Sequence, residues 1–337
     1  GTPSLFSARS IDTLLTQVRT LLPLDPLAEI TLEANPGTAE AQKFADFRSA
    51  GVNRLSLGIQ SFNPRHLQAL GRIHDDREAR FAVELALRNF DNVNLDLMYA
   101  LPEQTMEEAL ADIREAVSFG PQHISAYHLT LEPNTVFYNK PPSLPDDDMS
   151  AAMQEAIEAE LAGAGYEHYE ISAFAKKPSP LPNPLPPAGE GANESLRNTR
   201  VNRCRHNLNY WLFGDYLGIG AGAHGKLTLH DRILRQVRCR QPKTYMERAL
   251  AGNALEEERS VSPGELPFEF MMNALRLTEG FPVSLFSART GLSLTAALPM
   301  LEEAQRRGLV ERDALHIRPT LLGQRFLNEL LQLFLAE

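Results

Sequence analysis

The sequence predicts an α/β fold, because strand patterns in its first hundred residues are each followed by a helix pattern. Residues 29–33, 54–60 and 93–98 alternate apolar with polar side chains, which is the period-two signature of a strand. Helical spacing follows the first two strands, and a capping-box pattern at Thr105 opens a helix after the third. Regular alternation of strands and helices is typical of a parallel sheet or barrel. We therefore expect a partial (β/α) barrel over residues 1–175.

A polar side chain lies near the carboxyl end of each of these three strands. The three are Glu33, Gln60 and Asp96, and about 30 residues separate each from the next, which is about the length of one strand and helix unit. Parallel α/β folds bind their ligands at the carboxyl ends of the strands. A solvated strand end would explain any one of the three, but their recurrence favours a ligand site.

The remaining elements of this domain are expected in the same order. We predict a single helix at 36–50, a helix at 106–119, a strand at 123–131 and a helix at 148–163. The run Asp146-Asp147-Asp148 is typical of a helix N-terminus, where carboxylates interact favourably with the helix dipole. We prefer this interpretation to a metal site.

Residues 176–203 interrupt the pattern with a proline-rich and then small, polar stretch. Such a composition buries too little apolar surface to offset the entropy of ordering, so we expect a disordered insertion. The alternative is a proline motif that binds another protein domain.

Residues 204–262 begin with a glycine-rich segment, which we expect to associate with the barrel. The run of glycines without a phosphate-binding helix is weak support for a dinucleotide site. A lone histidine is most often structural, but His206 precedes Tyr210 and Trp211, and an imidazole beside two large aromatics suits a flat ligand such as a porphyrin.

Residues 263–337 predict a mostly helical, winged-helix-like domain. Two helix patterns precede a hairpin at 308–317, and a final amphipathic helix covers 320–334. Winged helices often bind DNA, but this segment lacks a strong basic stripe. Packing against the barrel or against a partner is the better interpretation.

Composition limits the class of protein. The chain has 337 residues, 43% of them hydrophobic, which is enough for a large core and more than one domain. The net charge of -10 argues against nucleic acid as a partner. The sequence shows no signal peptide and no membrane-spanning run, and its two cysteines fit a reducing cytosol, so we expect a cytoplasmic protein.

Several motifs in fixed order resemble one known family. They are EITLEANPGT at 29–38, NRLSLGIQSF at 53–62, LGRIHD at 70–75, NLDLMYALPEQT at 94–105, LTLEPNT at 129–135 and HNLNYW at 206–211. Together with Gly1-Thr2-Pro3-Ser4 they resemble the radical S-adenosylmethionine family that contains oxygen-independent coproporphyrinogen III dehydrogenase and the HemW heme chaperones. The resemblance covers nearly the whole chain except the proline-rich insertion. HNLNYW is similar to the heme-binding motif of the chaperones, which favours that branch.

The resemblance implies a radical-SAM-type barrel that holds S-adenosylmethionine and a [4Fe–4S] cluster at its strand ends, followed by a C-terminal helical domain. It also implies that His206 binds heme, and, more weakly, that His224 lies near a second cofactor molecule. Carried over residue by residue, the positions that contact S-adenosylmethionine are Gly1, Thr2, Glu33, Gln60, Arg72 and Asp96.

The sequence departs from the family in one respect. The family binds its cluster with a CxxxCxxC motif, whose three thiolates leave one iron free for the cofactor. This sequence contains only Cys204 and Cys239, which are far apart, so we expect the chain neither to assemble the cluster nor to cleave S-adenosylmethionine reductively. The start at Gly1 indicates a barrel that lacks its first elements, and we expect the unpaired sheet edge to promote aggregation.

Three functions follow from these observations. The preferred one is a heme chaperone that delivers heme to heme proteins such as respiratory enzymes, with peripheral membrane contact and a homodimer left open. The enzymatic alternative is oxidative decarboxylation of coproporphyrinogen III. A transcriptional or partner-binding module built on the winged helix ranks last because of the acidic balance.

Overall fold

The computed structural model describes residues 2–178 and 202–335, and these residues form two compact units. The first unit is Gly1–Arg203 and the second is Cys204–Glu337. Residues 204–262, which the sequence set apart as a separate segment, share the second unit with residues 263–337. Disorder was predicted for 176–203. Of this segment, residues 179–201 lie outside the described residues, as does Gly1, which was assigned to a cofactor site. Lys176 ends β6 and Arg203 is buried, so the predicted bounds are too wide at both ends.

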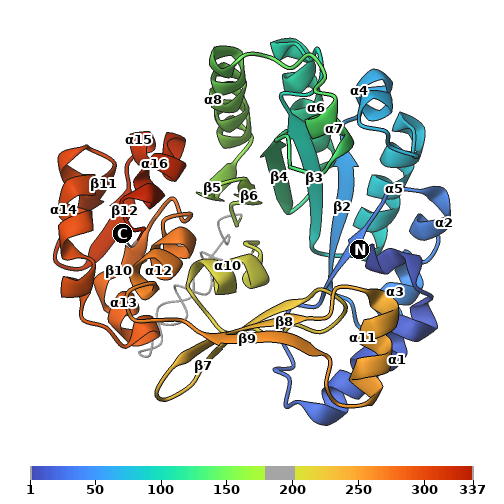
Figure 1. The fold of residues 1–337 in the computed structure, drawn as a ribbon. Helices are drawn as coiled ribbons and strands as arrows, with labels where there is room; N and C mark the ends of the chain where they lie inside the picture. The colour runs from blue at the N-terminus through green and yellow to red at the C-terminus, as the bar shows by residue number, and fades with distance from the viewer. Residues whose placement is uncertain (1, 179–201, 336–337) are drawn as a thin grey trace, which may run out of the picture. The chain divides into compact units, whose positions relative to one another are not determined.

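A six-stranded sheet forms the centre of the first unit (Figure 1). Its strands follow the order β1-β2-β3-β4-β6-β5, in which β1 to β4 run parallel and β6 pairs antiparallel with both β4 and β5. The strands are β1 (Thr31–Ala34), β2 (Arg54–Gln60), β3 (Val93–Tyr99), β4 (His123–His128), β5 (Tyr166–Glu170) and β6 (Ala173–Lys176). The prediction of a parallel α/β sheet is therefore confirmed.

Helices connect the parallel strands, as the alternating pattern predicts. The helices of this unit are α1 (Ala8–Leu21), α2 (Thr38–Ala41), α3 (Phe44–Ala50), α4 (Pro64–Ala69), α5 (Asp76–Asn89), α6 (Met106–Phe119), α7 (Val136–Asn139) and α8 (Asp147–Gly163), with a short 3-10 turn at Pro3–Leu5. Asp146 caps α8 by accepting from the Met149 amide, which confirms the helix-start interpretation of the aspartate run. The single helix predicted at 36–50 is wrong, because the chain breaks into α2 and α3 at residues 42 and 43.

The two faces of the sheet differ in chemistry. Leu55, Leu57 and Ile59 of β2 are fully buried in the apolar core, which the helices α3, α5, α6 and α8 complete. The opposite face of the same strand carries Ser56 and Gln60, which are also buried. Burial of both faces is typical of a parallel sheet. Polar side chains on the second face are therefore shielded from water and need hydrogen-bond partners within the protein.

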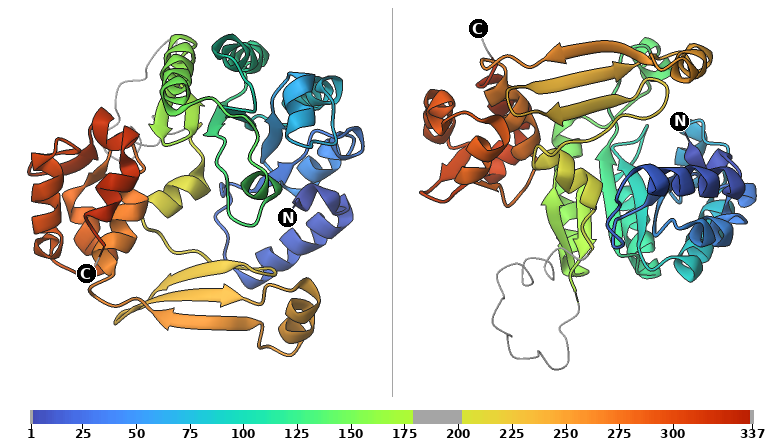
Figure 2. Two further views of the ribbon diagram at one scale, coloured as in Figure 1. Left: turned by 45° about the horizontal axis from the view of Figure 1, so that its top comes forward. Right: turned by 90° about the horizontal axis from the view of Figure 1, so that it is seen from below.

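The second unit contains two small antiparallel sheets (Figure 2). The first has the order β7-β8-β9, and the second has the order β10-β12-β11. The elements are α10 (Arg205–Trp211), β7 (His224–Thr228), β8 (Ile233–Arg238), α11 (Pro242–Leu250), β9 (Leu255–Ser260), α12 (Leu266–Ala274), β10 (Phe281–Pro282), α13 (Val283–Thr290), α14 (Leu298–Arg306), β11 (Val310–Arg312), β12 (His316–Pro319), α15 (Leu321–Arg325) and α16 (Leu327–Gln332), with a 3-10 turn at Leu294–Ala296.

The C-terminal elements follow the outline of a winged helix, with helices that precede a β-hairpin. Phe270 lies at the centre of their core, and the rings of Phe213, Phe281 and Phe286 pack edge-on around it. The predicted final helix is divided in two, because Phe326 leaves the helical conformation between α15 and α16. Within the described part of the chain, no helix combines the length and apolar character needed to cross a membrane.

Candidate functional site

The inner face of the barrel sheet brings the predicted strand-end residues near one another. Glu33 is exposed on β1 and lies in register with Ser56 of β2. The Ser56 hydroxyl in turn donates to the Asp96 carboxylate on β3 across 2.8 Å. The carboxylates of Glu33 on β1 and Asp96 on β3 therefore lie on either side of Ser56, which is on the strand between them, β2.

Gln60 ends β2 in an unusual backbone conformation. Its φ is 69°, in the left-handed region that residues with a side chain rarely adopt, and the register with β3 shifts between Leu57 and Gln60. A β-carbon on Gly58 would lie 3.0 Å from the Gln60 amide nitrogen, so glycine leaves the space that this amide occupies. Such conformations persist where the surroundings enforce them, and they are common at binding sites.

A buried carboxylate on α6 fixes the turn that follows Gln60. Asp112 accepts a hydrogen bond from the Ser61 hydroxyl at 2.6 Å and another from the Phe62 amide at 2.7 Å. Burial raises the pKa of Asp112 to about 6, although both hydrogen bonds favour the ionised form. The turn and the Gln60 conformation are thus tied to a helix on the opposite face of the sheet.

Two charged side chains at this site, Asp96 and Arg72, are partly shielded from water. Burial raises the pKa of Asp96, and hydrogen bonds from Ser56 and Asn94 oppose that rise. Burial lowers the pKa of Arg72, while the Asp96 carboxylate acts in the opposite direction. Thr2 lies at the end of β1, where its hydroxyl oxygen accepts from the Asn35 amide at 3.4 Å.

Asp96 belongs to a hydrogen-bonded network that the sequence did not predict. The Asn94 amide nitrogen donates to Ser56 and to Asp96, each across 2.8 Å. Because that nitrogen donates, the Asn94 oxygen is the acceptor, and it receives the His123 Nδ1 proton at 2.6 Å and the Ser125 hydroxyl at 3.1 Å. The network therefore spans β2, β3 and β4.

The network continues to the end of the first unit. In the neutral His123 imidazole, Nε2 accepts from the Tyr169 hydroxyl at 2.8 Å. The guanidinium of Arg203 lies 5.3 Å from the centre of the Tyr169 ring and pairs with Glu167 at 3.1 Å. Arg203 is buried, and the neighbouring Asn202 donates to the Lys176 carbonyl at 2.7 Å, so both edges of the predicted insertion are anchored on the β5-β6 hairpin.

The signal for this network was present in the sequence but weak. His123, Ser125 and Tyr127 alternate with apolar residues along β4, in the same way as the polar residues of β3. The periodicity could have placed His123 on the polar face. It could not show that β5, a strand absent from the prediction, brings Tyr169 to the imidazole.

The second unit contains the predicted heme ligand. His206 is exposed on α10, one helical turn before Tyr210, and the two rings meet edge-on with centres 6.4 Å apart. The His206 Nδ1 lies 3.2 Å from the sulfur of Cys204, the residue that precedes α10. Tyr210 packs in turn against Tyr216, with ring centres 4.7 Å apart.

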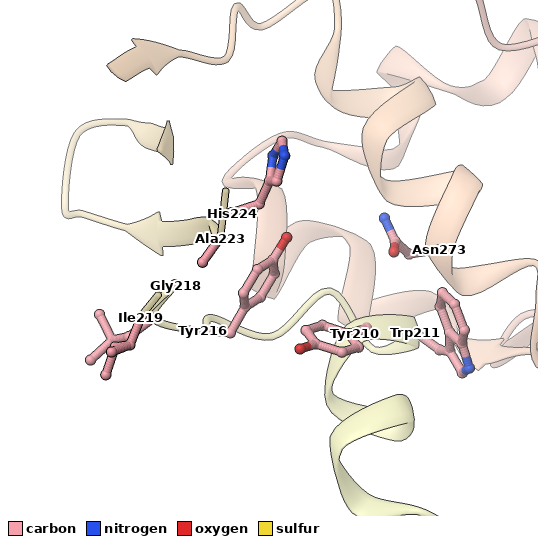
Figure 3. Close-up of a pocket in the computed structure, with 9 residues that line it drawn as sticks. Tyr210, Trp211, Tyr216, Gly218, Ile219, Ala223, His224 and Asn273 are labelled. Atoms are coloured by element: carbon pink, nitrogen blue, oxygen red, sulfur yellow. The ribbon is translucent and has the colours of Figure 1, made fainter. Parts of the chain in front are cut away.

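A cavity of about 470 Å³ lies beside these aromatic residues (Figure 3). Figure 3 shows Tyr210 between Tyr216 and Trp211, and it shows the Tyr216 hydroxyl pointing toward His224. The lining consists of Tyr210, Trp211, Tyr216, Leu217, Gly218, Ile219, Ala223, His224 and Asn273. The structure thus brings two aromatics of the HNLNYW motif together with His224, whereas His206 is not among the lining residues.

The fold and its sequence match two family descriptions. Residues 1–116 match the Radical SAM superfamily, and residues 261–326 match the HemN C-terminal domain. The solved structure of coproporphyrinogen III oxidase (HemN) from Escherichia coli, a radical SAM enzyme, superposes with a TM-score of 0.76 over 99% of this chain and 76% of that one. The sequence identity is 22%, so this likeness establishes the fold alone. The architecture is that of a radical SAM protein with a HemN-type C-terminal domain.

Sequence comparison gives a closer relationship. The heme chaperones HemW of Escherichia coli (strain K12) and of Haemophilus influenzae are each 47% identical over all of this chain and 82% of their own length. The heme chaperone HemW of Bacillus subtilis (strain 168) is 33% identical over all of this chain and 84% of its own length. The chain belongs to the HemW family.

Proposed function

We propose that this protein is a cytoplasmic heme chaperone, which binds heme in its second unit and passes it to heme-requiring proteins such as respiratory enzymes. The observation that carries the proposal is the cavity beside α10. Tyr210 and Trp211 of the HNLNYW motif line it, in a chain whose relatives at 47% identity are named heme chaperones.

The residues of the second unit fit heme chemically. A cavity of about 470 Å³ is within the usual range for small-molecule sites, about 300 to 1,000 Å³. Aromatic rings can lie against the macrocycle, and histidine is a common iron ligand. His206 is a candidate ligand by resemblance to the family motif, and it lies one turn outside the cavity.

The inner face of the barrel fits S-adenosylmethionine. The exposed Glu33 and the half-buried Asp96 can accept hydrogen bonds from ribose hydroxyls or from an ammonium group, and Arg72 can pair with a carboxylate. Gln60 can both donate and accept, and Thr2 offers a hydroxyl at the end of β1. When bound together with a [4Fe–4S] cluster, this cofactor would supply radical chemistry. Gly1 would complete the set by resemblance.

The residues of this chain do not fit the cluster itself. The family motif needs three closely spaced cysteines, and the printed sequence offers Cys204 and Cys239, both buried in the second unit. The proposed function therefore rests on heme binding and transfer, and no step passes through the cluster.

A heme titration tests the proposal. Ferric heme is added to the chain while the Soret absorbance is followed, and the loaded protein is then mixed with the apo form of a heme protein. We expect saturable binding near one heme per chain and transfer to the apoprotein. A chain that fails to bind heme, or that converts coproporphyrinogen III to a vinyl-bearing product, would refute the proposal.

A further inference from the structure

The loop that borders the cavity exposes two large apolar side chains in fixed positions. Leu217 is 54% exposed and Ile219 is 67% exposed, and both line the cavity. Between them, Gly218 packs directly on the backbone of His224, because a β-carbon there would lie 2.2 Å from the His224 carbonyl oxygen. Only glycine allows this approach, so the loop holds both aliphatic side chains beside His224.

Hydrogen bonds hold the same loop at several points. Arg238 Nε donates to the Gly218 carbonyl at 3.1 Å, and the Gly220 amide donates to the Tyr245 hydroxyl at 3.0 Å. The Gly222 amide donates to the Cys239 carbonyl at 2.9 Å. The exposure of Leu217 and Ile219 is thus built into a rigid loop, and a preformed apolar lip lowers the cost of binding an apolar ligand.

His224 offers an available imidazole at the edge of this lip. It is exposed at the start of β7, and its ring makes no hydrogen bond within the described residues. The facing Tyr216 is fixed, because Arg235 donates to its hydroxyl oxygen at 2.9 Å. Histidine is a common ligand of heme iron, and an imidazole beside an apolar, aromatic cavity is suited to that role.

We propose that His224 is an iron ligand of the heme in this cavity, with Tyr210 and Trp211 against the macrocycle and Leu217 and Ile219 covering its edge. The inference rests on the proposed heme-binding function and assigns the ligand within that site. It differs from the assignment of His206, which is separated from the cavity by a turn of α10.

Ferric heme titration of the full chain tests this ligand. The wild type is compared with His224→Ala and with His230→Ala, the latter as a control because His230 is 94% exposed in the turn of the same β7-β8 hairpin. We expect His224→Ala to weaken binding at least tenfold and to shift the Soret band, while His230→Ala matches the wild type. Added imidazole should restore the wild-type spectrum of His224→Ala. Far-UV circular dichroism establishes that each variant is folded.

Each result separates the inference from the function on which it rests. If the wild type and His224→Ala bind heme with the same spectrum and affinity, the ligand assignment is wrong and the proposed function stands. If the folded variant loses binding but imidazole does not restore the spectrum, His224 contributes to the packing of the cavity and does not bind the iron, and the assignment is again wrong. If the wild type binds no heme, both are wrong.

Discussion

The inner face of the barrel and the cavity of the second unit use polar and aromatic side chains in opposite ways. In the barrel, Asn94 and His123 are buried and bonded to each other, and Asp96 has hydrogen-bond partners on two strands. At the cavity, His224 and Leu217 are exposed and lie beside open space. Both regions are candidate ligand sites.

The difference distinguishes two kinds of candidate site. A site whose side chains already form hydrogen bonds with one another is rigid. A ligand then binds more tightly, because its binding groups are held in place before it arrives. At a site whose apolar and imidazole groups face solvent, binding is favoured because the ligand removes apolar surface from water. We therefore expect changes in the barrel network to cost folding stability, and changes in cavity side chains to cost mainly ligand affinity.

The largest expected effect concerns Asp112, the buried carboxylate that anchors the turn after Gln60. Its pKa is about 6 in the folded state, against an ordinary value of 3.8, so the folded chain retains this proton to higher pH than the unfolded chain. Its contribution to stability should therefore fall as pH rises from about 4 to about 6, by about 3 kcal/mol in total. Asp112→Asn should remove this part of the pH dependence in urea unfolding curves.

The control for this prediction is Asp91→Asn, since the Asp91 side chain is 94% exposed. That variant should keep the wild-type slope between pH 4 and pH 6. An Asp112→Asn curve parallel to the wild type over this range would show that the turn after Gln60 does not depend on the buried Asp112 carboxyl group.

The next largest effect concerns Gly218, where the cavity lip meets β7. Gly218→Ala places a β-carbon 2.2 Å from a backbone oxygen, and relief of that overlap should cost about 2 kcal/mol of stability. Heme binding should weaken as well, because the loop must move away from His224. Urea unfolding and heme titration measure the two effects.

Gly264→Ala is the matched variant, because a β-carbon there meets no atom within 4 Å. It should change neither quantity. If Gly218→Ala retains full heme affinity despite its lower stability, the fixed position of the lip is unimportant for binding.

A smaller effect separates two buried tyrosines of β5. Tyr169→Phe removes the hydroxyl that bonds to His123, and Tyr166→Phe removes a bond to the Pro121 carbonyl at 2.7 Å. Each should cost about 1 kcal/mol in unfolding experiments. Only Tyr169→Phe should weaken S-adenosylmethionine binding, measured by equilibrium dialysis, since only Tyr169 connects through His123 and Asn94 to Asp96. Equal binding by both variants would limit the network to a structural role.

The smallest effect on stability is expected at the cavity lip itself. Leu217→Ser and Ile219→Ser replace exposed side chains, so each should change the free energy of unfolding by less than about 0.5 kcal/mol. Heme affinity should nevertheless fall, because the apolar cover is lost. Leu250→Ser, at a position 93% exposed outside the cavity, should leave heme affinity unchanged.

Local patterns in the sequence were sufficient to predict much of the barrel. The bounds of β2 and α6 agree with the prediction at both ends, because alternation and a capping box are local signals. The strand predicted at residues 123–131 ends earlier, at His128. The hairpin of β5 and β6 was missed, since Tyr166 and Tyr169 lie three positions apart and do not alternate regularly with polar residues.

The contacts of the candidate sites were less predictable than the strands. Periodicity placed Glu33, Gln60 and Asp96 on polar faces, but hydrogen bonds such as Asn94 to His123 depend on strand register across 29 positions of sequence. The cavity depends on the close approach of Gly218 to His224, which the glycine run allowed but did not specify. Tertiary pairing of this kind has no local signal.

The two anchors of the proline-rich insertion have a consequence for how this fold can vary. Because Asn202 bonds back to Lys176, the chain leaves the β5-β6 hairpin and returns to it at nearly the same place. An engineered tag or reporter domain inserted between Lys176 and Asn202 should therefore leave the β5-β6 pairing intact, because the two ends of the insertion are already held together.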